Sequence, residues 1–224
     1  MRLVTWNIWN GGEGRLEAID RVLREQDGDV IALQEANDPA AVERLASSLE
    51  MELVYGEGNS EYAVAWLSRL PIARSRNHRL PVLEKTLLEI EVGGRHLFAT
   101  HLSAGRTLAH EPRRIAEAEA IVAQLGAGAG VLVGDFNAVH PRDEVGAPPP
   151  EEELEHVSRR PIELLIEAGL VDSFRELHPD AQGWTYVASQ PWARLDYVLA
   201  RELPRSCEVV ESDASDHFAL VADL

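Results

Sequence analysis

The residues best suited to chemistry are polar side chains placed where predicted strands end. Gly134-Asp135-Phe136-Asn137 follows an apolar run at 131–133, which the sequence predicts as a buried central strand. Because residues two apart point to the same side of a strand, we expect Asp135 and Asn137 to face one spot, with Phe136 packed away from it. An ordinary strand that ends in an Asp/Asn turn has the same sequence, so this stretch alone leaves both interpretations open.

Five other places carry similar side chains at or near predicted strands. Together with the first they are Asn7, Glu35, His101, Asp135 with Asn137, Asp196, and Asp216 with His217. Each has an ordinary explanation as a turn former, a solvated strand end or a satisfied histidine. As a set they supply carboxylates for a hard divalent cation, two histidines for proton transfer, and two asparagines as neutral donors. That combination suits metal-assisted cleavage of a phosphoester.

The elements that must position these side chains are predicted from periodicity and capping. Strands are predicted at 2–8, 30–33, 52–55, 62–68, 72–80, 86–92, 95–102, 131–133, 184–188, 194–200, 207–211 and 217–222. Helices are predicted at 13–26, with Gly28 as its cap, after Asp38, and at 112–125 and 161–168. This order favours an α/β fold in which two sheets pack face to face with helices outside.

Length and composition fit one domain over residues 1–224. The proline- and glutamate-rich stretch 147–155 is interpreted as a solvated excursion, because too little chain follows it for a second core. The formal charge of −17, from 21 basic and 38 acidic residues, disfavours long nucleic acid as a partner. A single cysteine excludes an internal disulfide. With neither a signal-peptide pattern nor a transmembrane segment recognised, we expect a cytoplasmic protein.

Seven short motifs follow one another in a recognisable order. They are Thr5-Trp6-Asn7-Ile8, Leu33-Gln34-Glu35, Ser68-Arg69-Leu70-Pro71-Ile72, Thr100-His101-Leu102, Gly134-Asp135-Phe136-Asn137, Arg194-Leu195-Asp196-Tyr197 and Ser215-Asp216-His217. In this order the chain resembles the endonuclease/exonuclease/phosphatase superfamily, with its deoxyribonuclease-I-like fold. The resemblance covers essentially the whole chain. It implies a four-layered α/β sandwich of two packed mixed β-sheets flanked by helices, with the site at one end of both sheets.

The resemblance also implies a metal site and a phosphate site. Glu35 would be the main Mg²⁺ ligand, with Asn7 and Asp216 close by and Mn²⁺ as a possible substitute. His217, held by Asp196, would position or deprotonate the attacking water, or stabilise the phosphate. Asp135 would orient the water, and Asn137 would donate to a phosphate oxygen. His101 would donate to the phosphate or the leaving oxygen, and Glu61 would fix the tautomer of His101.

Several residues near these motifs are weaker candidates. His140 and Arg142 follow the Asp135 motif and could contact the substrate, since loops at strand ends often set specificity. Trp9 and Trp192 could flank the mouth of the site and stack on a base, a sugar or an acyl chain. His101 stands where the apurinic-site branch of the family has a tyrosine, which disfavours abasic-site repair.

The sequence therefore predicts a Mg²⁺-dependent phosphoesterase that attacks phosphorus with an activated water. A small or lipid-like phosphodiester or phosphomonoester is favoured over duplex DNA because of the net charge. The alternatives are an endo- or exonuclease on DNA or RNA and, from another class, a non-catalytic phosphate-binding protein on the same fold.

Overall fold

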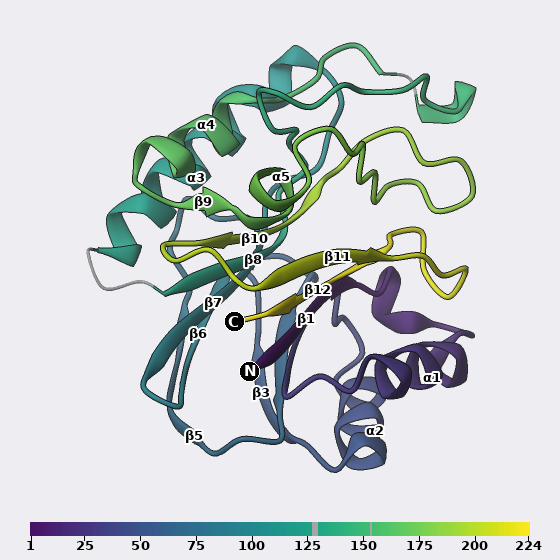
Figure 1. Cartoon of the computed structure of the whole chain (residues 1–224), viewed down its shortest axis with the longest axis vertical. Coiled ribbons are helices and arrows are strands. Elements are labelled where there is room, and N and C mark those ends of the chain that lie inside the picture. Colours follow the sequence, from purple (N-terminus) through teal and green to yellow (C-terminus); the bar gives the residue numbers. More distant parts are fainter. Residues whose placement is uncertain (127–129, 153) are drawn as a thin grey trace.

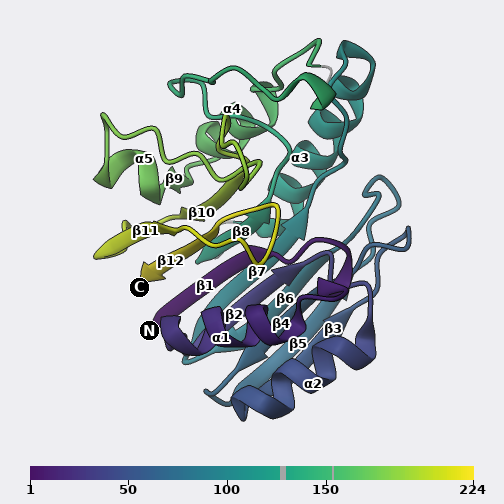
Figure 2. The same ribbon diagram turned by 90° about the vertical axis from the view of Figure 1, so that its right-hand side faces the viewer.

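Two six-stranded mixed sheets pack face to face at the centre of the molecule, and helices cover their outer faces (Figures 1 and 2). The computed structural model describes residues 1–126, 130–152 and 154–224. This arrangement confirms the predicted four-layered α/β sandwich. The two termini lie side by side in Figure 1, where the Leu224 amide donates to the Met1 carbonyl at 2.9 Å.

The first sheet is built from both ends of the chain. Its strand order is β11-β12-β1-β2-β4-β3, with β1 (Arg2–Asn7), β2 (Val30–Gln34), β3 (Glu52–Gly56), β4 (Val64–Ser68), β11 (Ser206–Val210) and β12 (Ala219–Asp223). Strand β1 runs parallel to β2 and antiparallel to β12. The helices α1 (Leu16–Gln26) and α2 (Pro39–Leu49) pack on its outer face.

The second sheet comes from the middle of the chain. Its order is β5-β6-β7-β8-β10-β9, with β5 (Ile72–His78), β6 (Leu87–Val92), β7 (Arg95–His101), β8 (Val131–Asp135), β9 (Val171–Asp172) and β10 (Asp196–Ala200). The helices α3 (Glu111–Leu125) and α4 (Arg160–Glu167) cover it, and α5 (Ser173–Leu177) lies against β10 and β11. In the part of the chain that the structure describes, every helix is too short or too polar to cross a membrane.

The central strands are apolar on both faces because both faces are buried. Along β2, Val30 and Ala32 pack between the sheets, whereas Ile31 and Leu33 pack under α1 and α2. Strand β8 alternates in the same way, with Val131 and Val133 between the sheets and Leu132 directed towards α3 and α4. Successive side chains of a central strand therefore point into different cores: one between the two sheets, one under α1 and α2, and one under α3 and α4. Polar side chains are left with positions at the strand ends.

Several predicted boundaries needed correction. Helix α1 begins at Leu16 rather than at residue 13, and Asp27, in the left-handed conformation, forms its C-cap in place of Gly28. The predicted strand 184–188 is wrong: Tyr186 makes only isolated bridges, to Ala193 and His217. Asp38 caps α2 as predicted, by accepting from two backbone amides. Strand β9 and helix α5 were not predicted.

The predicted excursion 147–155 is not simply solvated. It contains a 3-10 turn, Pro150–Glu152, and the Glu152 side chain is only 12% exposed. Glu152 accepts from the Tyr186 hydroxyl at 2.8 Å and pairs with Arg106. Glu153, which belongs to the same proline- and glutamate-rich stretch, lies outside the described residues.

Gly134 permits the close approach of β7 and β8. Its φ is 139°, and a Cβ atom built there would lie 1.9 Å from the Thr100 carbonyl oxygen. Only glycine fits both the backbone conformation and this distance. The parallel register that results pairs His101 with Asp135 at the end of the two strands.

Replacement of Gly134 by alanine should therefore push β7 and β8 apart. We expect the free energy of unfolding to fall by about 3 kcal/mol or more, at the upper end of overpacking effects. Gly14→Ala is the matched control, because Gly14 also has a positive φ, +71°, but has open space around its Cβ position. The control should cost only about 1 kcal/mol for the left-handed backbone. Equal losses for the two variants in urea denaturation would contradict this account.

Candidate active site

Strand register alone places three of the predicted residues in one row. His101 pairs with Asp135 across the parallel β7–β8 ladder, and Asp135 pairs with Asp196 across the antiparallel β8–β10 ladder. All three are buried. Directly paired residues on neighbouring strands lie close enough for their side chains to interact. The second sheet therefore presents a carboxylate flanked by a histidine and a second carboxylate.

The first sheet supplies the other half of the site. Asn7 pairs with Gln34 across the β1–β2 ladder. Glu35 directly follows Gln34, so it lies at the same edge of the sheet as Asn7. Glu35 has a φ of 53°, and its carbonyl accepts from the amides of Gly11 and Asn37, both at 2.8 Å. This tight turn directs the Glu35 carboxylate back towards Asn7.

The Asn7 side chain joins the two halves. Its Nδ2 donates to Glu35 Oε1 at 3.2 Å and to Asp135 Oδ2 at 3.0 Å, while its Oδ1 accepts from the Trp9 amide at 3.0 Å. In this arrangement the amide nitrogen, and not the oxygen, faces the carboxylates. Asn7 therefore bridges the predicted metal ligand Glu35 and Asp135.

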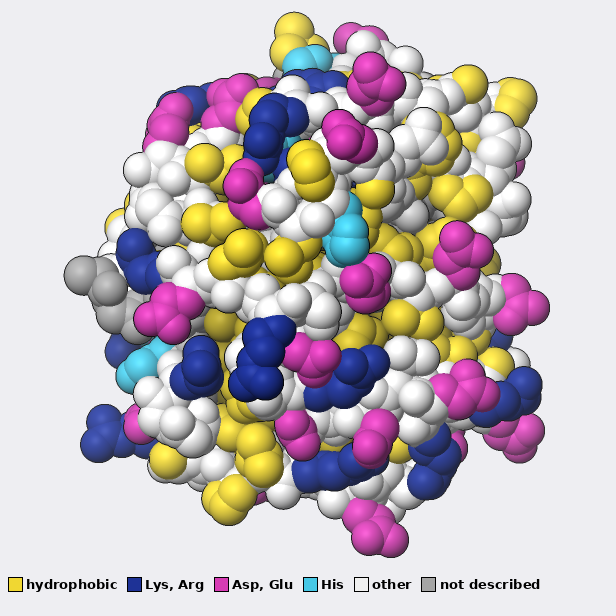
Figure 3. Space-filling model, viewed as in Figure 1, with side chains coloured by type: hydrophobic (Ala, Val, Ile, Leu, Met, Phe, Trp, Pro, Cys, Tyr) yellow, Lys and Arg dark blue, Asp and Glu magenta, His cyan; other side chains and the backbone are white. Residues whose placement is uncertain are grey.

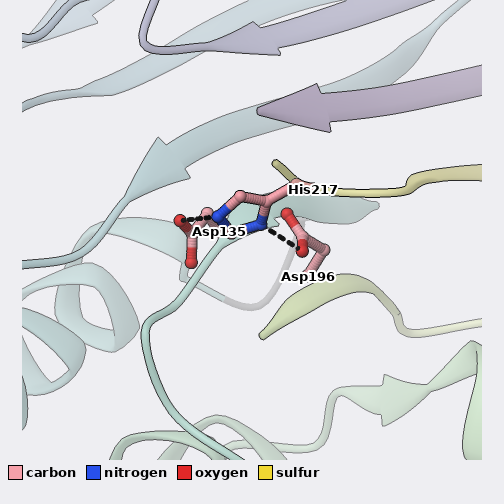
Figure 4. Close-up of side chains that lie close together, drawn as sticks. All are labelled: Asp135, Asp196 and His217. Atoms are coloured by element: carbon pink, nitrogen blue, oxygen red, sulfur yellow. Dashed lines mark hydrogen bonds and ion pairs between the residues drawn. The ribbon is translucent and has the colours of Figure 1, made fainter. Parts of the chain in front are cut away.

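His217 lies between two carboxylates, as Figure 4 shows. Its Nδ1 is 2.8 Å from Asp196 Oδ2, and its Nε2 is 3.7 Å from Asp135 Oδ2. Burial disfavours the imidazolium, but the attraction of Asp196, Asp135 and Asp216 outweighs burial and raises the pKa of His217 to about 10. At neutral pH, the metal-free protein therefore holds His217 as a cation.

Two contacts hold the backbone that precedes β12. The Trp6 indole donates to the His217 carbonyl at 2.8 Å, and the Ser215 hydroxyl donates to the Asn7 carbonyl at 2.7 Å. They tie the turn 215–217 to the end of β1. A site residue near the C-terminus is thereby fixed against one near the N-terminus.

Asn137 reaches the site by a turn and not by strand alternation. Strand β8 ends at Asp135, and Asn137 has a φ of 47° with its amide donating to Asp135 Oδ1 at 2.9 Å. Its Nδ2 lies 3.2 Å from His101 Nε2 and donates to the Leu102 carbonyl at 3.1 Å. The predicted meeting of Asp135 and Asn137 is confirmed, but its predicted cause was wrong. Phe136 packs in the α3–α4 core as predicted.

His101 has the opposite electrostatic character to His217. Burial, Lys85 and the charge on His217 lower the pKa of His101 well below its ordinary value. Its Nε2 is 3.3 Å from Asp135 Oδ2. The ring is therefore neutral at pH 7 and can form hydrogen bonds without carrying charge.

The predicted partner of His101, Glu61, is not in contact with it. Glu61 is exposed, and strand β4 begins only at Val64, so the side chain lies on the surface before the strand. Among the described residues, His101 Nδ1 has no hydrogen-bond partner. The neighbouring Tyr62 instead packs edge-on against the imidazole, with ring centroids 6.2 Å apart.

These side chains line one pocket of about 530 Å³, which we call the catalytic pocket. It brings together Glu35, His101, Asp135, Asn137, Asp216 and His217, with Asn7 and Asp196 held directly behind them. The remaining lining residues were not predicted as site residues: Asn10, Tyr62, Glu84, Lys85, Ala104, Arg106 and Tyr186, besides the weaker candidate Trp9.

Lys85 is the most notable residue that sequence reasoning missed. Its side chain is 2% exposed, and its ammonium donates to the Leu102 carbonyl at 2.9 Å and lies 5.3 Å from the Tyr62 ring centroid. Burial lowers its pKa. A lysine immediately before an apolar strand has the sequence pattern of a solvated charge. The one signal that the sequence offers is the position of Lys85 next to the start of a predicted strand.

His140 and Arg142 lie outside the catalytic pocket. His140 is buried, and its Nδ1 accepts from the Arg142 amide at 3.0 Å. The Arg142 guanidinium is exposed and pairs with Glu176. Trp192 is also buried, against Tyr186, and does not flank the mouth. The structure therefore does not support a substrate-binding role for His140 and Arg142.

Two groups of residues in the structure could hold a divalent cation. The tightest is Asp135, Asp196 and His217, whose ligand atoms lie within 4.8 Å of one another. However, both nitrogens of the His217 ring face carboxylates, and a protonated imidazole cannot ligate a metal. Glu35 and Asp216 offer oxygen atoms only, and the proximity of Glu35 adds to burial in raising the pKa of Asp216. A pair of oxygen ligands in which one carboxylate disfavours the charge of Asp216 suits a hard cation better.

The sequence matches the model of the Endonuclease/Exonuclease/phosphatase family over residues 4–217. The chain belongs to this family. The match spans all seven motifs, and it runs from β1 to the catalytic histidine candidate His217. As a member of the endonuclease/exonuclease/phosphatase family, the chain is a hydrolase of phosphoric esters. No curated protein sequence matches it.

Solved structures of similar fold include proteins that act on DNA. A variant of the 3′ phosphatase NExo from Neisseria, bound to a product DNA hairpin, has 22% identity and a TM-score of 0.80, with 100% of this chain and 99% of that chain covered. An AP endonuclease from Archaeoglobus fulgidus has 22% identity and a TM-score of 0.79, with 99% and 98% covered. At these identities the likeness confirms the endonuclease/exonuclease/phosphatase fold.

The two histidines should titrate on opposite sides of neutrality in metal-free protein. We expect His217 to lose its proton at about pH 10 and His101 to stay neutral well below pH 6.5. Because the folded-state pKa of His217 is raised, its charge stabilises the fold fully below about pH 6.5 and this contribution is lost as the pH rises to about 10. Nitrogen-15 NMR of the imidazoles in EDTA measures both values.

Asp196→Asn is the companion variant for this titration. It removes the nearest attraction, so the pKa of His217 should fall, and the loss of unfolding free energy should be larger at pH 7 than at pH 10. A His217 that titrates near pH 6.5 in the unaltered protein would contradict the electrostatic account of the site.

Proposed function

We propose that the chain is a Mg²⁺-dependent phosphoesterase that hydrolyses phosphoesters of nucleic acid by in-line attack of a water molecule. The observation that carries the proposal is the catalytic pocket itself. There, the imidazolium of His217, the neutral imidazole of His101 and the carboxamide of Asn7 surround Asp135, next to two further carboxylates. This inventory matches the needs of phosphoryl transfer, which are positioning and neutralisation of oxygen charge.

His217 and Asp196 form the charged arm of the site. The raised pKa makes His217 a cation at neutral pH, so we assign it the stabilisation of negative charge on the phosphate rather than proton abstraction. Asp196 fixes the ring through Nδ1 and leaves Nε2 directed at the pocket. This arrangement keeps a donor pre-positioned where charge develops, which is the most effective form of electrostatic stabilisation.

Asp135 is the candidate for orienting the water and accepting its proton. Burial raises the pKa of Asp135, and the positive His217 partly offsets this effect. A buried carboxylate with increased proton affinity, held beside an imidazolium, suits a general base. Asn137 Nδ2 supplies an uncharged donor for the phosphate or the leaving oxygen, and the neutral ring of His101 lies beside it, with Nε2 at 3.2 Å.

Glu35 and Asp216 would hold the divalent cation, which supplies Lewis-acid neutralisation of a phosphate oxygen when bound. Both line the catalytic pocket, and both offer the oxygen ligands that Mg²⁺ prefers. The Asn10 amide donates to Glu35 Oε2 at 2.8 Å and keeps that carboxylate oriented. Lys85 and Arg106 also line the pocket and add positive charge to it.

Nucleic acid replaces the small or lipid-like substrate that the net charge favoured. The similar structures include a 3′ phosphatase seen with DNA, a 3′-5′ exonuclease from Neisseria meningitidis and an AP endonuclease, which supports a nucleic acid substrate. On the face shown in Figure 3, basic and acidic side chains are interspersed, so the bulk charge of −17 is not uniform over the surface. The net charge remains the one observation in favour of a small or lipid-like phosphoester.

Asp135→Asn and His217→Ala should each lower kcat for a labelled oligonucleotide in Mg²⁺ by about 10²- to 10⁴-fold. His96→Ala is the matched control, because His96 sits at the other end of β7 and is 45% exposed. It should retain full activity. EDTA should abolish turnover in the unaltered protein, and added Mg²⁺ should restore it.

Parallel assays with inositol phosphates, phospholipid vesicles and bis-p-nitrophenyl phosphate separate the substrate classes. Binding of oligonucleotide should weaken steeply with salt, as expected for phosphate contacts. If kcat/KM were highest for a small or lipid-like ester, the second candidate would replace the first. If both site variants kept kcat within about threefold of the unaltered protein, far less than the loss of a general base or of an electrostatic stabiliser causes, the catalytic assignment would be wrong.

A further inference from the structure

A second hollow adjoins the catalytic pocket and shares Trp9 and Asp216 with it. We call it the Trp9 hollow. Its volume is about 630 Å³, and apolar groups dominate its walls, among them Val187, Ala188 and Phe218. A group attached to a phosphate in the catalytic pocket can therefore enter this hollow without leaving the protein surface.

Trp9 forms a fixed aromatic wall between the Trp9 hollow and the catalytic pocket. The side chain is 48% exposed, which is unusual for tryptophan, and its backbone φ of 49° is an outlier for a bulky residue. The Trp9 amide donates to Asn7 Oδ1 at 3.0 Å, and the Arg15 guanidinium lies 4.6 Å from the ring centroid. Arg15 also donates to the Ala214 carbonyl at 2.7 Å. A strained backbone conformation that is maintained by contacts of this kind is typical of a functional position.

The rim of the Trp9 hollow is acidic. Glu211 and Asp213 are exposed there, and Asp216 lies at its junction with the catalytic pocket. None of its lining residues is basic: they are Trp9, Val187, Ala188, Ser189, Glu211, Ser212, Asp213, Ser215, Asp216 and Phe218. A second phosphate of a polynucleotide would meet like charge in this hollow. An uncharged aromatic ring would meet an aromatic face and apolar walls.

We propose that the Trp9 hollow binds one terminal nucleobase of the substrate, stacked on Trp9, and that its acidic rim excludes a continuing strand. The enzyme would then act at a chain end, where a single nucleoside is joined to the phosphate in the catalytic pocket. This inference rests on the proposed function and narrows its substrate to nucleic acid ends. Base–aromatic stacking is tolerant of sequence, so the preference is for an end and not for a base.

The first measurement compares linear and circular single-stranded DNA of the same sequence in Mg²⁺. We expect the circle to be cleaved at least about tenfold more slowly, the factor that about 1.4 kcal/mol of repulsion gives. The double variant E211Q/D213N should increase cleavage of the circle relative to the linear strand. Equal rates on both substrates for the unaltered protein would overturn the proposal.

The second measurement tests the stacking role of Trp9. Trp9→Ala should lower kcat/KM for the linear strand by about 5- to 150-fold, mainly through KM, whereas Trp9→Phe should retain most of it. On a strand whose terminal nucleotide lacks a base, Trp9→Ala should have no further effect. Leu203→Ala is the control for loss of an exposed apolar side chain, because Leu203 is 49% exposed and lines a different hollow. It should behave as the unaltered protein.

The outcomes separate the inference from the proposed function. Suppose that DNA is cleaved but Trp9→Ala lowers kcat/KM equally on strands with and without a terminal base. The base-binding role is then overturned, and the catalytic assignment stands. If neither DNA is cleaved while bis-p-nitrophenyl phosphate is hydrolysed, both the nucleic acid proposal and this inference are wrong. Melting temperatures of the Trp9 variants identify any loss that comes from unfolding.

Discussion

The site depends on holding four carboxylates close together in a largely desolvated place. Asp135 and Asp196 come from neighbouring strands of one sheet, whereas Glu35 and Asp216 follow or precede strands of the other. Burial and like charge raise the pKa of both Asp135 and Asp216, so the arrangement opposes folding unless cations offset it. The imidazolium of His217 supplies one such cation, and a divalent ion between Glu35 and Asp216 would supply the other. The three apolar cores provide the rigidity that keeps the carboxylates from moving apart.

Much of this site could be predicted from the sequence because its residues lie at strand ends and in short motifs. Asn7, Glu35, His101 and Asp135 each close or follow an apolar run, and such runs end at the same edge when their strands are parallel. The layered α/β architecture also followed from strand and helix periodicity together with the motif order. Asp38 was correctly interpreted as a helix cap.

Other features depend on contacts between distant segments and left no local signal. The neighbouring positions of Asp135 and Asp196 result from strand pairing across 61 residues of chain, which local periodicity does not encode. Lys85 became a pocket residue because the β6 strand start lies under Leu102. Glu61 failed as a partner of His101 because β4 begins three residues later, and Asn137 reaches its place through a left-handed turn that strand alternation does not describe.

The most direct test of this account is the position of a bound metal in crystals grown with Mn²⁺ as a stand-in for Mg²⁺. Anomalous scattering distinguishes Mn²⁺ from the lighter atoms of the protein and of water, so it locates the ion directly. The account predicts one peak bonded to carboxylate oxygens of Glu35 and Asp216 at about 2.1 Å, the distance typical of Mg²⁺, with the His217 ring still bonded to Asp196. A peak among Asp135, Asp196 and His217, with the His217–Asp196 bond broken, would contradict it.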